Sequence, residues 1–344
     1  MKKLTSLFLA LLFLFSSVTV LMSCTQPADD HKTKIAYLSG STGIGMAKMI
    51  SDNAENEAYE FAKFDGATDL RDELLSAECD IDVAALPTNL ASLVYNKTNG
   101  KYKVIALNTL GVLYIATNGV TLSSLNDLVG KTVYIPEAAP GYILRYVLEA
   151  NDIHVIDSDT DTAAGVKFDY TYDLESLPTM LASGVNPDND EPVQIGLLPE
   201  PKLTVTQVTA QSNGNTVSVP FDITDEWNKV CETPLVQGCL VASASYIEAH
   251  PTLLSVFMSE YEASVSYMKK SDNLDSAADI VVSLKILPKK PIALKAIPRC
   301  NLTYTTGDDM KAALSAYLTV LHTQNAQAIG GKLPDDAFYY TPSK

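Results

Sequence analysis

One stretch near the amino terminus combines small and hydroxyl-bearing residues in a pattern that can hold a polar ligand. Residues 38–45 read LSGSTGIG, with an apolar stretch before them and a helical pattern after them. The segment is therefore expected to join a strand to a helix. A loop in that place presents backbone N–H groups and the positive end of the helix dipole to an anionic or polar group. The alternative is an ordinary tight turn in which Ser41 or Thr42 caps the helix.

The glycines of this loop do not form a nucleotide-binding motif. A dinucleotide fingerprint would need a third glycine where Lys48 stands, after Gly43 and Gly45. A phosphate-binding P-loop would need a lysine directly after Gly45, where Met46 stands. Neither motif is present.

Three further segments place small or polar residues directly after an apolar stretch. They are residues 86–89 (LPTN), 136–142 (PEAAPGY) and 198–201 (LPEP). Ligands of open α/β sheets bind beyond the carboxyl ends of the strands. We therefore expect the four loops to converge on one cleft between two lobes.

The elements that must position these loops alternate between strands and helices. Strands are predicted at residues 34–38, 59–64, 81–85 and 103–107, and helices at 43–51, 68–77 and 87–95. A second cycle has strands at residues 131–135, 167–172 and 193–198 and helices at 141–150 and 173–182. Residues 186–191 and 209–217 are predicted to be surface loops, and a strand at 236–242 precedes a mostly helical region that reaches residue 327. This alternation predicts an α/β fold with a largely parallel sheet in each of two units.

The amino terminus predicts export from the cytoplasm. Lys2 and Lys3 precede an apolar stretch at residues 4–22, as in a secretory signal. Leu21, Ser23 and Cys24 resemble the end of a bacterial lipoprotein signal. Residues 1–23 are therefore expected to be removed, and lipid that includes palmitate is expected to be attached to Cys24. Residues 24–32 are expected to form a polar tether. The alternative is an uncleaved membrane anchor, since about 20 apolar residues cross a bilayer.

The composition excludes some partners and leaves the cysteines undecided. The 344 residues carry a net charge of −16, which disfavours nucleic acid. Cys79, Cys231, Cys239 and Cys300 contain no Cys-x-x-Cys pair, and histidines such as His154 and His250 are scattered, so no metal site is predicted. One or two disulfides and buried free thiols are both compatible with the sequence.

Taken together, these segments resemble the solute-binding lipoproteins of ATP-driven importers, in the family that binds nitrate, sulfonates, taurine, bicarbonate and thiamine pyrimidines. The matching positions are Cys24 and residues 38–45, 82–89, 125–133, 198–201 and 330–338. The resemblance implies a type II periplasmic-binding-protein fold, with lobe I at residues 33–116 plus 236–344 and lobe II at 117–235. A two-strand hinge containing Gly111 and Gly238 would join the lobes and allow closure around a ligand.

The resemblance also implies which residues contact the ligand. They are Ser41, Thr42, Gly43, Pro87, Thr88, Asn89, Glu137, Ala138, Ala139, Pro199 and Glu200. Tyr37 and Tyr114 could supply an apolar wall, although core packing explains them better. Glu200 could instead be a carboxylate that favours the start of a helix.

The ligand implied is a small polar or heteroaromatic molecule. No predicted loop contains Arg or Lys, and the chain has only Arg71, Arg145 and Arg299, which argues against a strongly anionic ligand. A neutral heterocycle, or an organic cation held by Glu137 or Glu200, is the alternative.

The functional expectation is transport without catalysis. An extracytoplasmic monomer, lipid-anchored to the bacterial cell membrane, would deliver its ligand to a permease with its ATPase, without a cofactor. An enzyme of the pyrimidine-precursor type is an alternative, but the Cys-rich cluster and active-site His of those enzymes are missing from the predicted loops. A ligand sensor that borrowed the fold is a third possibility.

Overall fold

The computed structural model describes residues 29–136, 138–158 and 160–341. The described helices and strands all lie in the unit formed by residues 32–344. The predicted signal, Cys24, residues 24–28 of the tether and Glu137 lie outside the described residues. Among the residues that are described, no helix has both the length and the apolar character needed to cross a membrane.

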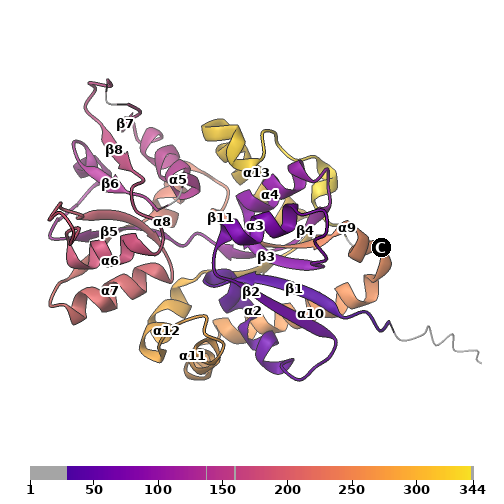
Figure 1. Cartoon of the computed structure of the whole chain (residues 1–344). Helices are drawn as coiled ribbons and strands as arrows, with labels where there is room; N and C mark the ends of the chain where they lie inside the picture. The colour runs from indigo at the N-terminus through magenta and orange to yellow at the C-terminus, as the bar shows by residue number, and fades with distance from the viewer. Residues whose placement is uncertain (1–28, 137, 159, 342–344) are drawn as a thin grey trace, which may run out of the picture. The chain divides into compact units, whose positions relative to one another are not determined.

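The first sheet has six strands in the order β12-β4-β11-β3-β1-β2 (Figure 1). β1 pairs in parallel with β2 and β3, whereas β11 is antiparallel to both β3 and β4. The chain thus returns to this sheet after building the second one. The strands are β1 (Thr33–Leu38), β2 (Tyr59–Phe64), β3 (Val83–Pro87), β4 (Tyr102–Leu110), β11 (Val236–Ser243) and β12 (Leu302–Thr305).

The second sheet also has six strands, in the order β10-β5-β9-β6-β8-β7. β6 is parallel to β8 and β9, and β5 is antiparallel to β9 and β10. Its strands come from one uninterrupted stretch of chain between β4 and β11. They are β5 (Leu113–Asn118), β6 (Thr132–Tyr134), β7 (Val155–Ile156), β8 (Val166–Asp169), β9 (Ile195–Pro199) and β10 (Val217–Asp222).

Helices cover both sheets, and several begin or end where the sequence provides a cap or breaker. Pro87 adopts extended backbone at the end of β3 and directly precedes α4, and Pro251 occupies the first turn of α10. Gly184 ends α6 with a φ of 81°, a conformation that glycine adopts readily. The helices are α2 (Ser41–Asp52), α3 (Ala67–Leu75), α4 (Thr88–Lys97), α5 (Ala138–Glu149), α6 (Ser176–Ser183), α7 (Lys202–Ser212), α8 (Ile223–Val230), α9 (Ala244–Ala249), α10 (Pro251–Lys269), α11 (Leu274–Ser283), α12 (Lys290–Ala296) and α13 (Gly307–Asn325), with 3-10 turns η1 (Leu125–Leu128), η2 (Ser271–Asn273), η3 (Ile297–Arg299), η4 (Ala326–Ile329) and η5 (Asp336–Phe338).

The alternation of strands and helices predicted from the sequence is confirmed, but the prediction of largely parallel sheets is wrong. Both sheets are mixed, because β5, β10, β11 and β12 pair in the antiparallel direction with their neighbours. Local differences from the prediction are also present. Residues 209–212 belong to α7 and not to a loop, because buried Leu203, Thr204 and Ala210 anchor that helix. Pro87 ends a strand, whereas the prediction placed it in the first turn of a helix. The short strand β12 interrupts the region that was predicted to be mostly helical, because it pairs with the edge of β4.

Candidate ligand-binding site

The amino-terminal end of α2 is shaped by glycine. Gly40 precedes the helix with a φ of 121°, and no side chain caps the first turn, so neither Ser41 nor Thr42 is the cap. Thr42 Oγ1 donates to the carbonyl oxygen of Leu38 at 3.5 Å. A Cβ atom at Gly43 would lie 2.5 Å from the same carbonyl oxygen. Gly43 therefore permits the close approach of α2 to β1.

Two of the four predicted loops meet, although they come from different sheets. Ser41 Oγ at the start of α2 donates to the carbonyl oxygen of Glu200, in the loop between β9 and α7, at 3.2 Å. Both residues are buried, with 8% and 3% of their surface exposed. This hydrogen bond joins the carboxyl-terminal side of β1 to that of β9.

The Glu200 carboxylate, which follows β9 of the second sheet, forms an ion pair with Arg299, which precedes β12 of the first sheet. Arg299 Nε, at the end of η3, lies 3.0 Å from Glu200 Oε1, and the Glu200 side chain is fully buried whereas that of Arg299 is 32% exposed. Thr204 Oγ1 donates to Glu200 Oε1 at 3.0 Å, and the Thr204 backbone N–H donates to Glu200 Oε2 at 3.3 Å. Both carboxylate oxygens are therefore engaged.

Aromatic and amide groups complete the surroundings of Arg299. Its guanidinium carbon lies 4.9 Å from the centre of the Tyr114 ring, within the range of a cation–π interaction. Arg299 Nη1 donates to Gln207 Oε1 at 3.2 Å. Burial raises the pKa of Glu200 above its ordinary value, although Arg299 and Thr204 act in the opposite direction. Burial also raises the pKa of Tyr114 to about 12, so its hydroxyl stays protonated at neutral pH.

The other predicted ligand-binding residues lie at the ends of the expected strands. Thr88 opens α4, is fully buried, and donates from Oγ1 to the carbonyl oxygen of Val236 at 2.8 Å. Asn89 is half-buried beside it. Pro87 and Pro199 are the last residues of β3 and β9, and Ala138 and Ala139 begin α5, with Ala139 half-buried.

The two predicted hinge glycines are closely surrounded by side chains. A Cβ atom at Gly111 would lie 2.3 Å from Thr224 Oγ1, and one at Gly238 would lie 2.4 Å from Asn108 Oδ1. Asn301 Nδ2, two residues after Arg299, donates to the Gly111 carbonyl oxygen. Gly111 lies between β4 and β5, where the chain passes from the first sheet to the second, whereas Gly238 lies inside β11, where it pairs with Pro87 and Thr109.

The four described cysteines are not joined in disulfides. Cys79, Cys231, Cys239 and Cys300 are free thiols. Cys300 is buried next to Arg299, and burial raises the pKa of its thiol to about 12. Tyr37 is buried in β1. Among the described residues, no group of three or more His, Cys, Asp or Glu side chains is placed to hold a metal ion.

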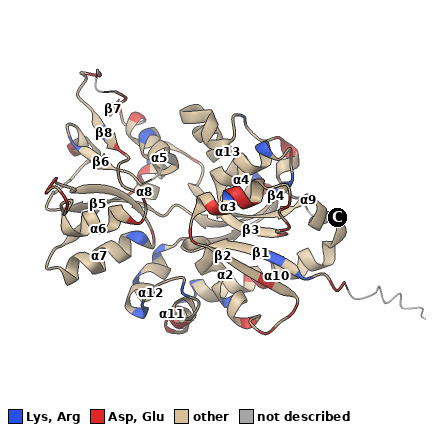
Figure 2. Ribbon diagram, viewed as in Figure 1, with Lys and Arg blue, Asp and Glu red and all other residues tan. Residues whose placement is uncertain are grey.

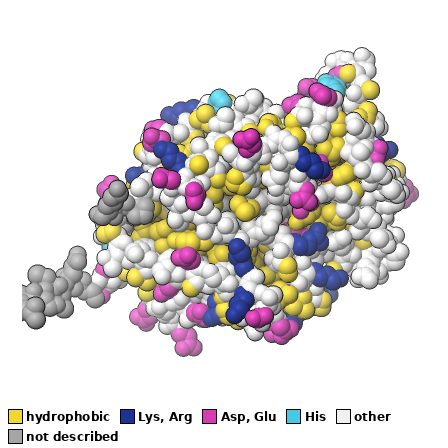
Figure 3. Space-filling model, turned by 180° about the vertical axis from the view of Figure 1, so that it is seen from behind, with side chains coloured by type: hydrophobic (Ala, Val, Ile, Leu, Met, Phe, Trp, Pro, Cys, Tyr) yellow, Lys and Arg dark blue, Asp and Glu magenta, His cyan; other side chains and the backbone are white. Residues whose placement is uncertain are grey.

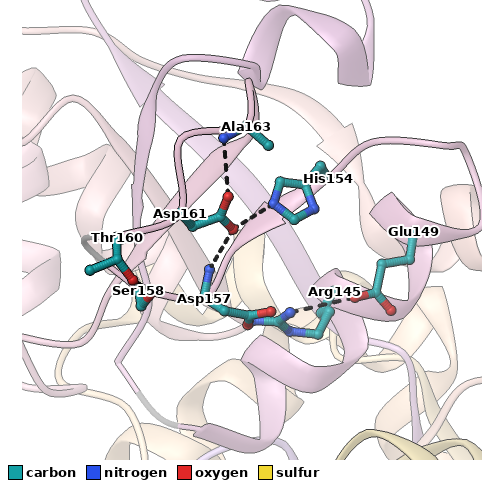
Figure 4. A network of polar contacts seen from close by, with 8 residues as sticks. All are labelled: Arg145, Glu149, His154, Asp157, Ser158, Thr160, Asp161 and Ala163. Atoms are coloured by element: carbon teal, nitrogen blue, oxygen red, sulfur yellow. Dashed lines mark hydrogen bonds and ion pairs between the residues drawn. The ribbon is translucent and has the colours of Figure 1, made fainter.

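His154 and His250 each contact a neighbouring side chain away from Glu200 and Arg299. His154 Nε2 lies 2.7 Å from Asp161 Oδ2, beside an ion pair between Arg145 and Asp157 (Figure 4). This network occupies the segment between β7 and β8 and the neighbouring face of α5. His250 lies against the ring of Tyr246, with centroids 5.6 Å apart.

The sequence analysis did not identify Arg299 as a residue of the site. Arg299 is the cation that pairs with Glu200 where the loop after β9 meets η3. Its position before an unpredicted strand concealed it, because β12 and η3 carry no strong sequence pattern. A signal was nevertheless available, since Arg299 is one of only three arginines in the chain.

Comparison with known proteins identifies the fold. No family model matches the sequence, and no curated protein matches it. An ABC transporter from Parabacteroides distasonis superposes with a TM-score of 0.71 and 18% identity, covering 91% of this chain and 100% of that one. The periplasmic aliphatic sulphonate binding protein SsuA from Escherichia coli gives 0.65 and 12%, covering 91% and 93%. The alkanesulfonate-binding protein SsuA from Xanthomonas axonopodis pv. citri, bound to MOPS, gives 0.62 and 12%, covering 88% and 94%.

These similarities define the class of fold that the chain adopts. The chain has the periplasmic binding protein fold, which confirms the fold predicted from the sequence. Its structural neighbours include binding components of ABC import systems.

Proposed function

We propose that the chain is an extracytoplasmic solute-binding lipoprotein. It captures a small polar or heteroaromatic molecule by closure of two lobes and delivers it to the permease of an ABC importer, which acts with an ATPase. Lobe I comprises residues 33–116 plus 236–344 and lobe II residues 117–235. The lipid on Cys24 holds this monomer at the outer side of the cell membrane, and no catalytic residue or cofactor takes part.

The observation that carries the proposal is the contact between Ser41 and Glu200. It joins loops that follow strands of two different sheets, which is where open α/β folds bind their ligands. The similarity to periplasmic binding proteins over about nine-tenths of the chain supports the same interpretation.

The proposed ligand contacts come from the loops that follow β1, β3, β6 and β9. Asn89 is half-buried at the start of α4, where its side-chain amide and the unpaired backbone N–H groups of the first turn would contact the ligand. Thr88, by contrast, already donates its hydroxyl hydrogen to Val236, so its contribution is through the backbone. Gly111 and Gly238 mark the two crossings at which the lobes rotate.

A ligand screen tests the proposal. The full chain, purified in detergent, is heated in the presence of sulfonates, nitrate, bicarbonate, pyrimidines, amines and vitamins. A ligand at about 100 times its Kd adds about 2.7 kcal/mol to the free energy of unfolding, which shifts the thermal midpoint visibly. The expected result is a saturable shift with one compound class and no conversion of that compound when it is recovered by chromatography.

Variants decide whether the hit occupies the proposed site. Asn89→Ala should raise the Kd of the hit about tenfold or more, with a change of less than about 1 kcal/mol in unfolding free energy. Asn228→Ala, an exposed amide on α8, is the matched control and should leave the Kd unchanged. Turnover of the compound would indicate an enzyme, and an unchanged Kd in Asn89→Ala would place the ligand elsewhere.

A further inference from the structure

Of the three arginines in the chain, only Arg299 reaches the junction between the two sheets. Arg71 pairs with Asp72 on α3. Arg145 pairs with Glu149, which also lies on α5, and with Asp157, which directly follows β7. Arg299 lies between buried Glu200 and the ring of Tyr114. Any bidentate recognition of an anion by arginine at this junction would therefore depend on Arg299.

The charge of Arg299 is already matched inside the protein. Glu200 Oε1 lies 3.0 Å from Arg299 Nε, and the Glu200 side chain has no exposed surface. Gln207 takes a second N–H group of the same guanidinium. The carboxylate thus stands where the anionic group of a ligand would otherwise pair with the arginine.

We infer that Glu200 determines specificity by neutralising Arg299, so that the site takes an uncharged polar molecule and excludes sulfonates and similar anions. This inference rests on the proposed function, because it concerns the ligand of the same site. It also separates the chain from the sulphonate binding proteins that share its fold.

The ion pair between Glu200 and Arg299 disfavours binding of both anions and cations. An anion that paired with Arg299 would have to displace Glu200 and leave a carboxylate buried without its partner, which is strongly unfavourable. A cation that approached Glu200 would meet Arg299, which covers the carboxylate and is the more exposed of the two. Helix α7, which follows Glu200, packs on α12, which directly precedes η3 and Arg299 (Figure 2).

The decisive experiment frees the guanidinium. Isothermal titration with ethanesulfonate is carried out on the full chain and on Glu200→Gln, which keeps the side-chain shape and removes the charge. Wild type should show no detectable binding of ethanesulfonate. Glu200→Gln should bind ethanesulfonate with a Kd at least about tenfold below the weakest Kd that the titration can detect, because the freed guanidinium can pair with the sulfonate. The double variant Glu200→Gln with Arg299→Gln should lose this gain, because it has no cation left.

A matched control removes a similar ion pair outside the junction. Glu175 pairs with Lys202 at 2.7 Å at the start of α7, and its side chain is 79% exposed. Glu175→Gln should therefore bind ethanesulfonate no better than wild type. Equal gains in Glu175→Gln and Glu200→Gln would mean that only the overall charge had changed, and this would overturn the inference.

The outcomes separate the inference from the proposed function. Sulfonate binding by wild type, or a folded Glu200→Gln variant that gains none, overturns the inference while an uncharged hit from the screen still upholds the solute-binding role. If Glu200→Gln binds ethanesulfonate but the screen finds no ligand for wild type, the result supports the role of Glu200 in neutralising Arg299. It then gives no support to the proposed solute-binding function. If Glu200→Gln does not fold, the titrations of wild type test the inference. Binding of an uncharged ligand without binding of ethanesulfonate supports it, and binding of ethanesulfonate by wild type refutes it.

Discussion

Glu200 shows how one buried carboxylate couples protonation to folding. Burial raises its pKa above the ordinary glutamate value, so the folded chain retains a proton at pH values where the unfolded chain has released it. The free energy of unfolding should therefore fall as the pH rises from about 4.5 through this raised pKa. Urea unfolding of wild type between about pH 4.5 and about pH 8 should show the decrease, and Glu200→Gln should lack that component. Parallel pH profiles for the two proteins would contradict this prediction.

Single residues also mark the limit of what the sequence could predict about the site. The loop that contains Ser41, Thr42 and Gly43 was recognisable because three small or hydroxyl residues follow a strand. The partner of Glu200 was not recognisable, because Arg299 lies 99 positions later in the sequence, before a strand whose pairing is purely long-range. Charge pairs between distant segments depend on the tertiary fold and leave no periodic signal.

At the level of elements, hydrophobic periodicity was enough to predict a helix or strand wherever one face of the segment is buried along its whole length. The strand at residues 59–64 was predicted with the bounds that β2 has, and α2 and α4 differ from their predicted bounds by one or two residues at each end. Strands β5, β10 and β12 were missed, because each is antiparallel and borders the chain crossings or a sheet edge. Helix α7 was partly missed because Thr, Gln and Ser dominate its last turns, where packing and not propensity decides.

Helix α8 carries an element-scale prediction through its tryptophan. Trp227 is fully buried, its Nε1 donates to the Thr233 carbonyl oxygen at 2.7 Å, and its ring lies between Tyr146 of α5 and Tyr317 of α13. Trp227→Ala should lower the free energy of unfolding by about 3–5 kcal/mol, because it removes the contacts that join these three helices. Urea unfolding measures the loss, and Lys229→Ala on the exposed side of α8 serves as the control. A loss below about 1 kcal/mol would show that α5 and α13 are held together without this residue.

At the scale of the molecule, the charged side chains on the face drawn in Figure 3 do not form a single acidic patch. Asp and Glu side chains lie at separate positions there, interspersed with Lys and Arg. The net charge of −16 therefore acts on the molecule as a whole, favouring solubility and opposing the approach of polyanions. Local specificity must come from pairs such as Glu200 and Arg299.

The division of the chain at residues 31 and 32 supports a prediction about anchoring. All the ligand-binding residues proposed here lie in the unit that begins at Lys32, whereas Cys24 precedes it. Cys24→Ser should therefore abolish incorporation of labelled palmitate and move the protein out of the membrane fraction, because lipid chains provide the attachment. The thermal shift produced by a ligand should stay the same, since no site residue changes. If the variant remained in the membrane fraction without palmitate, residues 4–22 would be acting as an uncleaved anchor, the alternative that the apolar stretch allows.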